Sequence, residues 1–241
     1  MKRIALDTVD STMKYLARYD DVACEDSFVL VTAELQTEGR GQQGTSWESE
    51  RAQNLLFSIR LNRLSLKSDK LFLLSEVNAL ALVETLDEYA EGFSIKWPND
   101  IYFEDKKISG TLVQHTFQGT AVAHTIIGVG LNVNQAVFKS DAPNPVSLIN
   151  IIGREIDKEQ LLTSYLKRFE EYLLVLSSDH CEALHQRYLE RLYRLGQWAD
   201  YRDAQGCFRA RIVDVEPSGL LVVALTDGAL RRYAFKEVQY E

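Results

Sequence analysis

Three short stretches concentrate the residues that could bind or act on a small ligand. The first, GRGQQG at residues 39–44, has the G-x-G-x-x-G spacing that lets backbone amides approach a pyrophosphate in dinucleotide-binding loops. The second, KWPNDIYFEDKKISG at residues 96–110, places lysines and an Asn-Asp pair around a turn, so charged groups could converge at one end of a sheet. The third, IIGVGLNVN at residues 126–134, has glycines within a strand, which would let a ligand lie along its backbone.

Each stretch also has a plain structural interpretation. The glycine loop is not followed by a helical pattern, and no acidic residue stands about 20 positions on to hold a ribose, so the dinucleotide interpretation is disfavoured. The loop could simply join the strands expected at residues 28–35 and 54–61. The P-N-D turn could be held by its own backbone hydrogen bonds, with solvated lysines beside it, and the strand glycines could mark a bulge.

Composition limits the functional classes. The 241 residues are 46% hydrophobic and 26% charged, which is typical of a globular chain with one large and one small domain. The net charge is −8 and no stripe of Lys or Arg is present, so we expect no nucleic-acid partner. Three cysteines without a C-x-x-C pair fit a reducing compartment: Cys24, Cys181 and Cys207.

Two further features bear on metal binding and location. His180, Cys181 and His185 lie close in the sequence but lack the usual spacing of metal ligands. The N-terminus has no apolar signal-peptide core, and polar residues interrupt the most apolar helix, expected at residues 71–86. We therefore expect a cytoplasmic protein without a membrane partner.

The order of patterns divides the chain into two regions. A short helix near Ser11 precedes the two strands and the glycine loop, and a long helix follows at about residues 70–89. A β-rich block begins at Phe93, and residues 143–194 are helical in pattern, with a clear amphipathic period at 157–176. After Gly196 the alternation of apolar and polar residues predicts a small barrel-like unit.

Taken together and in order, the three stretches resemble the catalytic domain of biotin protein ligases. The resemblance rests on Asp10-Ser11-Thr12, GRG with Trp47, KWPND with the following K-x-x-G, and G-V-G-L-N, and KWPND with K-x-x-G is highly specific. It covers residues 10–134 and continues more loosely to the end of the chain. It implies an α+β fold: a mixed sheet with flanking helices at residues 1–195, and a small SH3-like β-barrel at residues 196–241.

The resemblance implies an adenylating enzyme. In that family the carboxylate of biotin attacks the α-phosphorus of ATP, pyrophosphate leaves, and a lysine of a biotin carboxyl carrier protein then attacks the biotinyl-adenylate. Negative charge gathers on the phosphoryl oxygens, so fixed cations are the main catalytic requirement. Biotin and ATP are the implied substrates, Mg²⁺ is expected with the ATP, and the implied catalytic residues are Lys107, Arg40 and Asp100.

The resemblance also assigns the binding residues. Hydroxyls and an amide can satisfy the ureido ring of biotin, whereas glycines leave room for its tail. The implied biotin-binding residues are Ser11, Thr12, Gln36, Gly39, Arg40, Lys107, Gly110, Gly128 and Gly130. The implied ATP-binding residues are Arg40, Trp47, Lys96, Asn99, Lys107 and Asn132. Ser11 and Thr12 could instead cap a helix, and Trp47 could belong to the core.

Departures from the family pattern lead to further expectations. Many members read GRGRRGR where this chain has GRGQQGT, and many read DSTN where Met13 follows Thr12. Because Gln42 offers no charge, we expect weaker retention of the adenylate, which Gln42→Arg should tighten. The glycines favour a loop at residues 39–51 that is mobile without ligand and ordered over the adenylate.

Alternatives to a biotin ligase remain at this point. A lipoate or other acyl ligase could use the same scaffold, although the R-R-x-x-G-G-G type loop typical of lipoate ligases is absent. A biotin-binding module without catalysis is the other alternative, and the presence of Arg40 and Lys107 argues against it. Only nine residues precede Asp10, so we expect neither the winged helix of regulatory members nor specific DNA binding. A homodimer through a sheet edge occurs in the family.

Overall fold

The fold is that of a computed structural model, which describes residues 1–19, 28–41, 45–62, 66, 70–140, 142–176 and 181–241. Expectations that concern Cys24, Gln42, Gly44 and His180 lie outside these residues.

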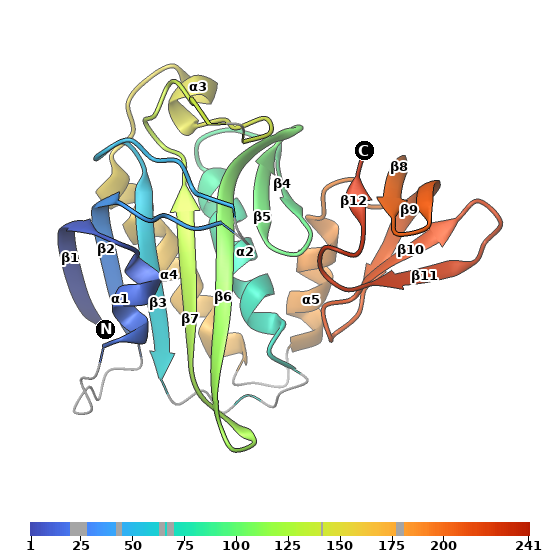
Figure 1. Ribbon diagram of the computed structural model, residues 1–241, viewed down its shortest axis with the longest axis horizontal. Coiled ribbons are helices and arrows are strands. Elements are labelled where there is room, and N and C mark those ends of the chain that lie inside the picture. The colour runs from blue at the N-terminus through green and yellow to red at the C-terminus, as the bar shows by residue number, and fades with distance from the viewer. Residues whose placement is uncertain (20–27, 42–44, 63–65, 67–69, 141, 177–180) are drawn as a thin grey trace.

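A seven-stranded mixed sheet forms the larger part of the molecule (Figure 1). Its strands run in the order β1-β2-β3-β7-β6-β5-β4, and only β1 and β2 are parallel. The strands are β1 (Lys2–Val9), β2 (Phe28–Gln36), β3 (Leu55–Asn62), β4 (Phe93–Lys96), β5 (Asp100–Phe103), β6 (Lys106–Gln118) and β7 (Ala121–Leu131). The expected mixed sheet is confirmed, but the sequence pattern had not indicated β1.

Both faces of this sheet are covered by helices, which explains why its central strands are apolar on both sides. On one face, α1 (Thr12–Ala17) packs through Leu16 against Val29 and Val31. On the opposite face, the main core contains Phe57 of β3 together with α2 and α4 (Figure 1). The helices on that side are α2 (Leu73–Leu86), α4 (Lys158–Leu176) and α5 (Cys181–Glu190), and α3 (Leu148–Ile152) lies in the segment that connects β7 to α4.

Helix α2 is buried along nearly its whole length, including the polar residues that interrupt its apolar pattern. Asn78 donates from Nδ2 to Thr111 Oγ1 at 3.0 Å and accepts from the hydroxyl of Tyr165 at 2.8 Å. A buried amide with both partners satisfied costs little and fixes the register of its neighbours. Asn78 therefore links α2 to both β6 and α4 and fixes the position of the helix relative to this strand.

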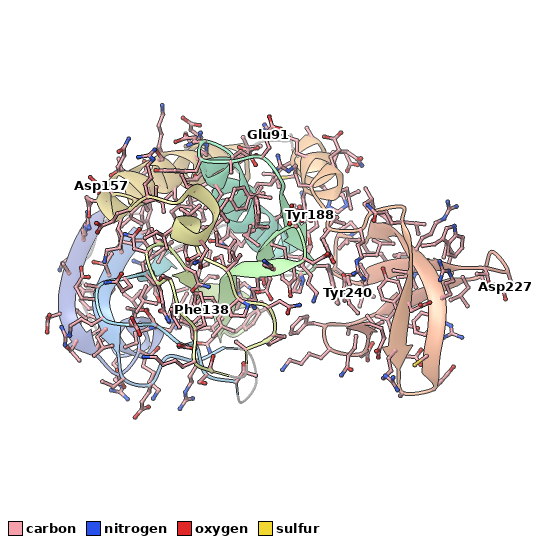
Figure 2. All side chains as sticks on the ribbon, turned by 90° about the horizontal axis from the view of Figure 1, so that it is seen from above. Glu91, Phe138, Asp157, Tyr188, Asp227 and Tyr240 are labelled. Atoms are coloured by element: carbon pink, nitrogen blue, oxygen red, sulfur yellow. The ribbon has the colours of Figure 1, made fainter. Side chains whose placement is uncertain are left out.

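The C-terminal region forms a second, antiparallel sheet in the order β11-β10-β9-β8-β12. Its strands are β8 (Trp198–Asp203), β9 (Gly206–Val215), β10 (Leu221–Leu225), β11 (Leu230–Tyr233) and β12 (Gln239–Tyr240). Within the described ranges its edge strands β11 and β12 do not pair with each other, so the expected SH3-like unit is an open sheet. Figure 2 shows Tyr240 where this sheet meets the larger part and Asp227 at its far end.

The described residues hold neither a membrane-spanning helix nor a cluster of metal-binding side chains. No helix there has both the length and the apolar run needed to cross a bilayer. Groups of three His, Cys, Asp or Glu side chains placed to hold a metal ion are not found there either.

Candidate active site

A pocket of about 160 Å³ opens on the α1 face of the large sheet, over β6 and β7. Gly110 pairs with Gly130 across these two strands, and Gly128 pairs with Ser58 of β3. Because side chains alternate along a strand, these three glycines lie on the same face of the sheet and leave it without side chains there. The pocket exists because three neighbouring positions of the sheet lack a Cβ.

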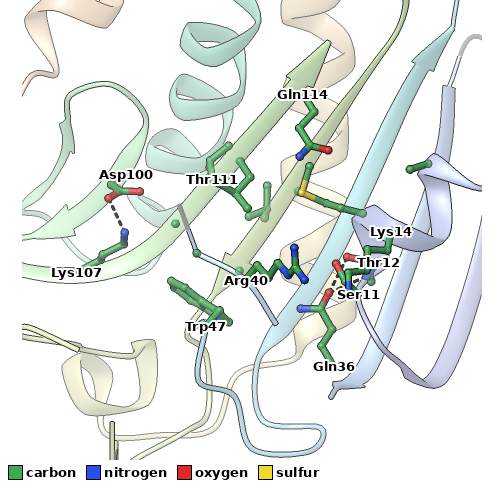
Figure 3. A pocket seen from close by; sticks show the side chains of 18 residues that line it. Ser11, Thr12, Lys14, Gln36, Arg40, Trp47, Asp100, Lys107, Thr111 and Gln114 are labelled. Atoms are coloured by element: carbon green, nitrogen blue, oxygen red, sulfur yellow. Dashed lines mark hydrogen bonds and ion pairs between the residues drawn. The ribbon is translucent and has the colours of Figure 1, made fainter. Parts of the chain in front are cut away.

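Side chains of the protein itself fill part of this hollow (Figure 3). A Cβ at Gly128 would collide with the sulfur of Met13, and one at Gly130 would collide with the Trp47 ring. A Cβ at Gly110 would stand 2.8 Å from Trp47 Cζ3. The glycines therefore admit close neighbours, as expected, but Met13 and Trp47 are the neighbours present.

Hydrogen bonds hold one end of the pocket in place. Thr12 donates from its backbone N–H and from its hydroxyl to Gln36 Oε1, at 2.8 and 3.0 Å. Its hydroxyl also lies 2.7 Å from Ser58 Oγ. Ser11 is the N-cap residue of α1, but its side chain makes no capping bond. The Gln36 amide nitrogen and the Ser11 hydroxyl are thus not used by these bonds.

An ion pair forms the opposite end. Lys107 Nζ lies 2.5 Å from Asp100 Oδ2, and the ammonium group stands 5.9 Å from the centre of the Trp47 ring. The Lys107 backbone is fixed by Asn144 O, which accepts its N–H at 2.8 Å, and by Val146 N–H, which donates to its carbonyl. The described residues thus bring Lys107 and Asp100 together, as the sequence predicts.

The glycine loop brings Arg40 over the pocket. Gly41 donates its N–H to Thr45 O and Trp47 donates to Gly39 O, and Arg40 pairs with Ser46 as an antiparallel bridge. The described ends of the loop are therefore hairpin-like. Figure 3 shows the guanidinium of Arg40 between Trp47 and the group formed by Ser11, Thr12 and Gln36.

Two buried polar atoms beside the pocket lack partners among the described residues: Trp47 Nε1 and Asn132 Oδ1. Asn132 is 3% exposed and donates from Nδ2 to Val146 O at 3.0 Å, so only its acceptor is unused. An unpaired buried acceptor costs free energy unless a ligand supplies the donor. A ligand amino group would supply the donor that Asn132 Oδ1 lacks, whereas Trp47 Nε1 would need an acceptor.

Lys96, which is expected among the ATP-binding residues, does not line the pocket. Its ammonium lies 4.7 Å from the ring centres of both Tyr102 and Tyr240 and donates to the Tyr102 hydroxyl at 3.0 Å. Burial lowers the pKa of Lys96, and the nearby Asp100 carboxylate opposes this shift only in part. The strand alternation that places Lys96 on β4 directs it toward the C-terminal sheet.

A wider groove of about 780 Å³ runs between the two sheets and shares Arg40, Gly41, Leu112 and Gln114 with the pocket. We call it the intersheet groove. Asn99 lines this groove rather than the pocket, with its Nδ2 3.4 Å from Ser75 Oγ and its Oδ1 unpartnered among the described residues. The groove is an open route from the surface to Arg40.

Most of the predicted residues meet at one pocket. Those that line it are Ser11, Thr12, Gln36, Arg40, Trp47, Asp100, Lys107, Gly110, Gly128 and Gly130. Gly39, Lys96, Asn99 and Asn132 do not. Lining residues that the sequence did not indicate are Met13, Lys14, Ala17, Gly41, Thr111, Leu112, Gln114 and Val129. Period-2 alternation from Gly110 could have identified Leu112 and Gln114.

Comparison with known proteins supplies independent findings. The profile of the biotin/lipoate A/B protein ligase family matches residues 5–132. The bifunctional ligase/repressor BirA of Bacillus subtilis is 29% identical over 218 residues, covering 85% of this chain and 64% of that protein. The biotin–protein ligase of Homo sapiens is 33% identical over 172 residues, covering 69% of this chain and 21% of that protein. The chain therefore spans less than two thirds of the length of these relatives.

A solved structure agrees over the whole chain. Biotin protein ligase from Aquifex aeolicus, in complex with biotin and ATP, superposes with a TM-score of 0.83 at 27% identity. The match covers 100% of this chain and 99% of that one.

Proposed function

Because the chain belongs to the biotin/lipoate A/B protein ligase family, we propose that it is an ATP-dependent biotin–protein ligase. It would form biotinyl-adenylate and pass the biotin to a lysine of a biotin carboxyl carrier protein. The observation that carries this proposal is the pocket itself, which has the hydrogen-bonding groups of Ser11, Thr12 and Gln36 at one end and the Lys107–Asp100 pair at the other, with Arg40 between them. A similar solved structure with biotin and ATP bound supports it.

The Ser11 end suits the ureido ring of biotin. The ring carbonyl needs a donor, which the Gln36 amide nitrogen offers because Gln36 Oε1 is already engaged by Thr12. The ring N–H groups need acceptors, and the Ser11 hydroxyl is one. The dithiolane ring of lipoate has no such groups and would leave the buried Ser11 hydroxyl and the half-buried Gln36 amide unpaired, which disfavours binding.

The Lys107 end suits the adenylation step. A carboxylate that approaches a phosphate is repelled, and a cation between the two groups offsets the repulsion. Lys107 would bridge the biotin carboxylate and the α-phosphate, with Arg40 across the pocket as the second cation. The carboxylate oxygen forms a bond to the α-phosphorus while the bond to pyrophosphate breaks.

The nucleotide would extend from there along β7. The Trp47 ring would stack on adenine, whose amino group would donate to Asn132 Oδ1, the unused acceptor. Asn99 would lie near the phosphates of the nucleotide, because it lines the intersheet groove and its Oδ1 has no partner among the described residues. Lys96 could take part only by leaving its two tyrosine rings.

A magnesium ion fits the residues present. Mg²⁺ in nucleotide sites is held by one or two carboxylates together with phosphate oxygens and water. Asp100 supplies one carboxylate, of which Oδ2 contacts Lys107. When bound, the ion would neutralise phosphate charge. Asp100 would hold it and later orient the incoming lysine amine.

The acceptor lysine would enter through the intersheet groove, which reaches Arg40 from the surface. Its neutral amine attacks the biotinyl carbonyl carbon, an amide bond forms, AMP leaves, and the amine proton passes to solvent.

A homodimer through a sheet edge is a further proposal. Ile95 of β4 exchanges hydrogen bonds with Arg191 and Tyr193, so β1 is the edge proposed for pairing.

The test is pyrophosphate release from ATP with biotin and with lipoate in parallel. We expect release with biotin, and labelling of a carrier protein when it is added. Pyrophosphate release with lipoate but not with biotin would show that the protein is a lipoate ligase instead. If the protein bound biotin but released pyrophosphate with neither acid, it would be a biotin-binding module without catalysis.

A further inference from the structure

Glu48, the residue after Trp47, holds two distant segments together. Its carboxylate accepts the backbone N–H of Lys139 at 2.9 Å and that of Ser140 at 2.7 Å. It also accepts the side-chain amide of Gln135 at 3.1 Å. Partial burial opposes ionisation of Glu48, but the hydrogen bonds from Ser140, Lys139 and Gln135 outweigh it and lower the pKa. The carboxylate is therefore ionised at neutral pH and bound by several donors.

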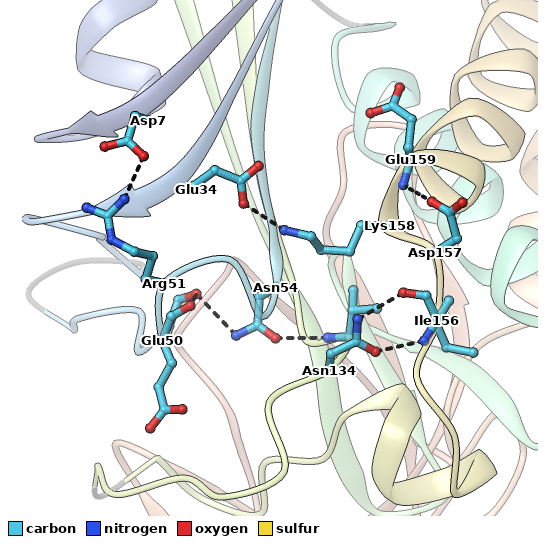
Figure 4. A network of polar contacts seen from close by, with 12 residues as sticks. Asp7, Glu34, Glu50, Arg51, Asn54, Asn134, Ile156, Asp157, Lys158 and Glu159 are labelled. Carbon is cyan, nitrogen blue, oxygen red and sulfur yellow. Dashed lines mark hydrogen bonds and ion pairs between the residues drawn. The ribbon is translucent and has the colours of Figure 1, made fainter.

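Gln135 reinforces the same junction from the other side. It is 1% exposed, and its Oε1 accepts the backbone N–H of Glu50 at 2.9 Å and Asn54 Nδ2 at 2.7 Å. Asn54 in turn accepts the N–H of Val133 at 2.9 Å (Figure 4). The segment that follows Trp47 is thus fastened to the segment that follows Asn132.

These contacts matter because little else holds the Trp47 ring. Its Nε1 has no hydrogen-bond partner among the described residues, and the ring rests on Gly110 and Gly130, which offer only backbone. A flat side chain over a glycine surface meets no interlocking side chain from that surface, so the position of the ring depends on the loop that carries it. The adjacent Glu48 is the charged anchor in this part of the loop.

We propose that Glu48 is a positioning residue for nucleotide binding. It fixes Trp47 at a set distance from Asn132 in the closed form of the loop, so that the two sides of the adenine site are aligned in the form that binds ATP. This inference rests on the proposed function, since it concerns the same nucleotide. A ligand that finds its contacts preformed loses less entropy on binding than one that must order them. Glu48 acts through Trp47 and touches no reacting atom.

Glu50 provides the matched control. It carries the same charge two residues away, but among the described residues its carboxylate contacts only the exposed Lys139 ammonium, at 3.2 Å. Exposed pairs of this kind contribute little. Glu48→Ala and Glu50→Gln therefore remove similar charges but different anchors. Glu48→Gln is a milder change than Glu48→Ala, because its remaining side-chain oxygen can still accept a backbone N–H, whereas its amide nitrogen cannot.

The first measurement is turnover at varied ATP and biotin. We expect Glu48→Ala to raise KM for ATP by about 10-fold or more, as loss of hydrogen bonds to a charged group does. Both kcat and KM for biotin should stay within about twofold, as expected when only binding is weakened. Glu48→Gln should fall between Glu48→Ala and wild type, and Glu50→Gln should match wild type. An unchanged KM for ATP in folded Glu48→Ala would overturn the inference.

The second measurement needs no activity. With the three tryptophans labelled as 5-fluorotryptophan, Trp47→Phe identifies the Trp47 fluorine resonance. Without ligand, that resonance should shift or broaden in Glu48→Ala and Glu48→Gln and stay in place in Glu50→Gln. An unmoved Trp47 resonance would refute the positioning role. If wild type consumes no ATP, the proposed function fails, and the fluorine spectra still decide whether Glu48 positions Trp47.

Discussion

At the scale of single residues, Lys106 and Lys107 are neighbours in sequence with different surroundings. Lys106 is exposed, whereas Lys107 pairs with Asp100 at the pocket. We expect Lys107→Ala to lower the adenylation rate by about 100-fold or more, because charge on the α-phosphate loses its fixed cation. The measurement is biotin-dependent pyrophosphate release, with unfolding curves to confirm that the fold survives.

Lys106→Ala is the control for that variant, because it removes the same charge from the same hairpin. Its rate should stay within about twofold of wild type. Near-normal adenylation in folded Lys107→Ala would refute the role given to Lys107. Arg40→Ala should resemble Lys107→Ala and should also bind the adenylate less tightly.

At the scale of elements, α2 and α5 are joined by a pair whose strength depends on pH. His185 Nδ1 lies 2.7 Å from Glu76 Oε1, and Glu76 is fully buried. The hydrogen bond to Glu76 raises the pKa of His185, and the Asp214 carboxylate acts in the same direction against the opposing effect of burial. Because the pKa of His185 is higher in the folded than in the unfolded protein, the pair stabilises the fold fully below the unfolded pKa of about 6.5. This stabilisation is lost as the pH rises through the folded pKa.

The prediction concerns the difference in unfolding free energy between wild type and His185→Gln. This difference should be largest below about pH 6.5 and should shrink steadily as the pH is raised. Denaturant titrations at several pH values measure it. A difference that is constant with pH would show that His185 contributes by packing rather than by charge.

The glycine loop supports a prediction about exchange of two amides. Gly41 and Trp47 already donate to Thr45 O and Gly39 O across the hairpin-like ends of the loop. We expect biotin with ATP to slow the exchange of both amides by about 10-fold or more, because a ligand that binds the closed state shifts the opening equilibrium. Hydrogen exchange followed by NMR gives the rates, and the Tyr165 amide in α4 serves as the internal control. Rates that ligand leaves unchanged would contradict ordering of the loop.

Sequence patterns predicted elements well where contacts are local. The amphipathic period at 157–176 matches α4, and the turn at Pro98 brings Asp100 to Lys107. Sequence patterns did not predict contacts between segments that are far apart in the chain. Glu48 contacts Ser140, and Met13 fills the space over Gly128, only because folding brings these segments together. The position of Lys96 beside Tyr240 was not predictable, because the pattern did not reveal the rings of the C-terminal sheet.

At the scale of the whole molecule, the two sheets share a core. Trp97, which is 5% exposed, donates from Nε1 to Gly219 O at 3.0 Å and packs its ring against Phe235. Buried residues of both sheets form a single cluster. Calorimetry should therefore show one cooperative transition, and Trp97→Ala should lower the free energy of unfolding by about 3–5 kcal/mol. Two separate transitions in wild type would contradict this coupling.

The hollows over β7 also constrain how the sequence can change over generations. A side chain at position 128 or 130 would collide with Met13 or Trp47, respectively. The flexible Met13 side chain can move aside, whereas the rigid Trp47 ring cannot, so mutation of Gly130 is conditional on the genetic background. Descendants of this sequence can fill the pocket from position 130 most readily after Trp47 has been replaced by a smaller residue.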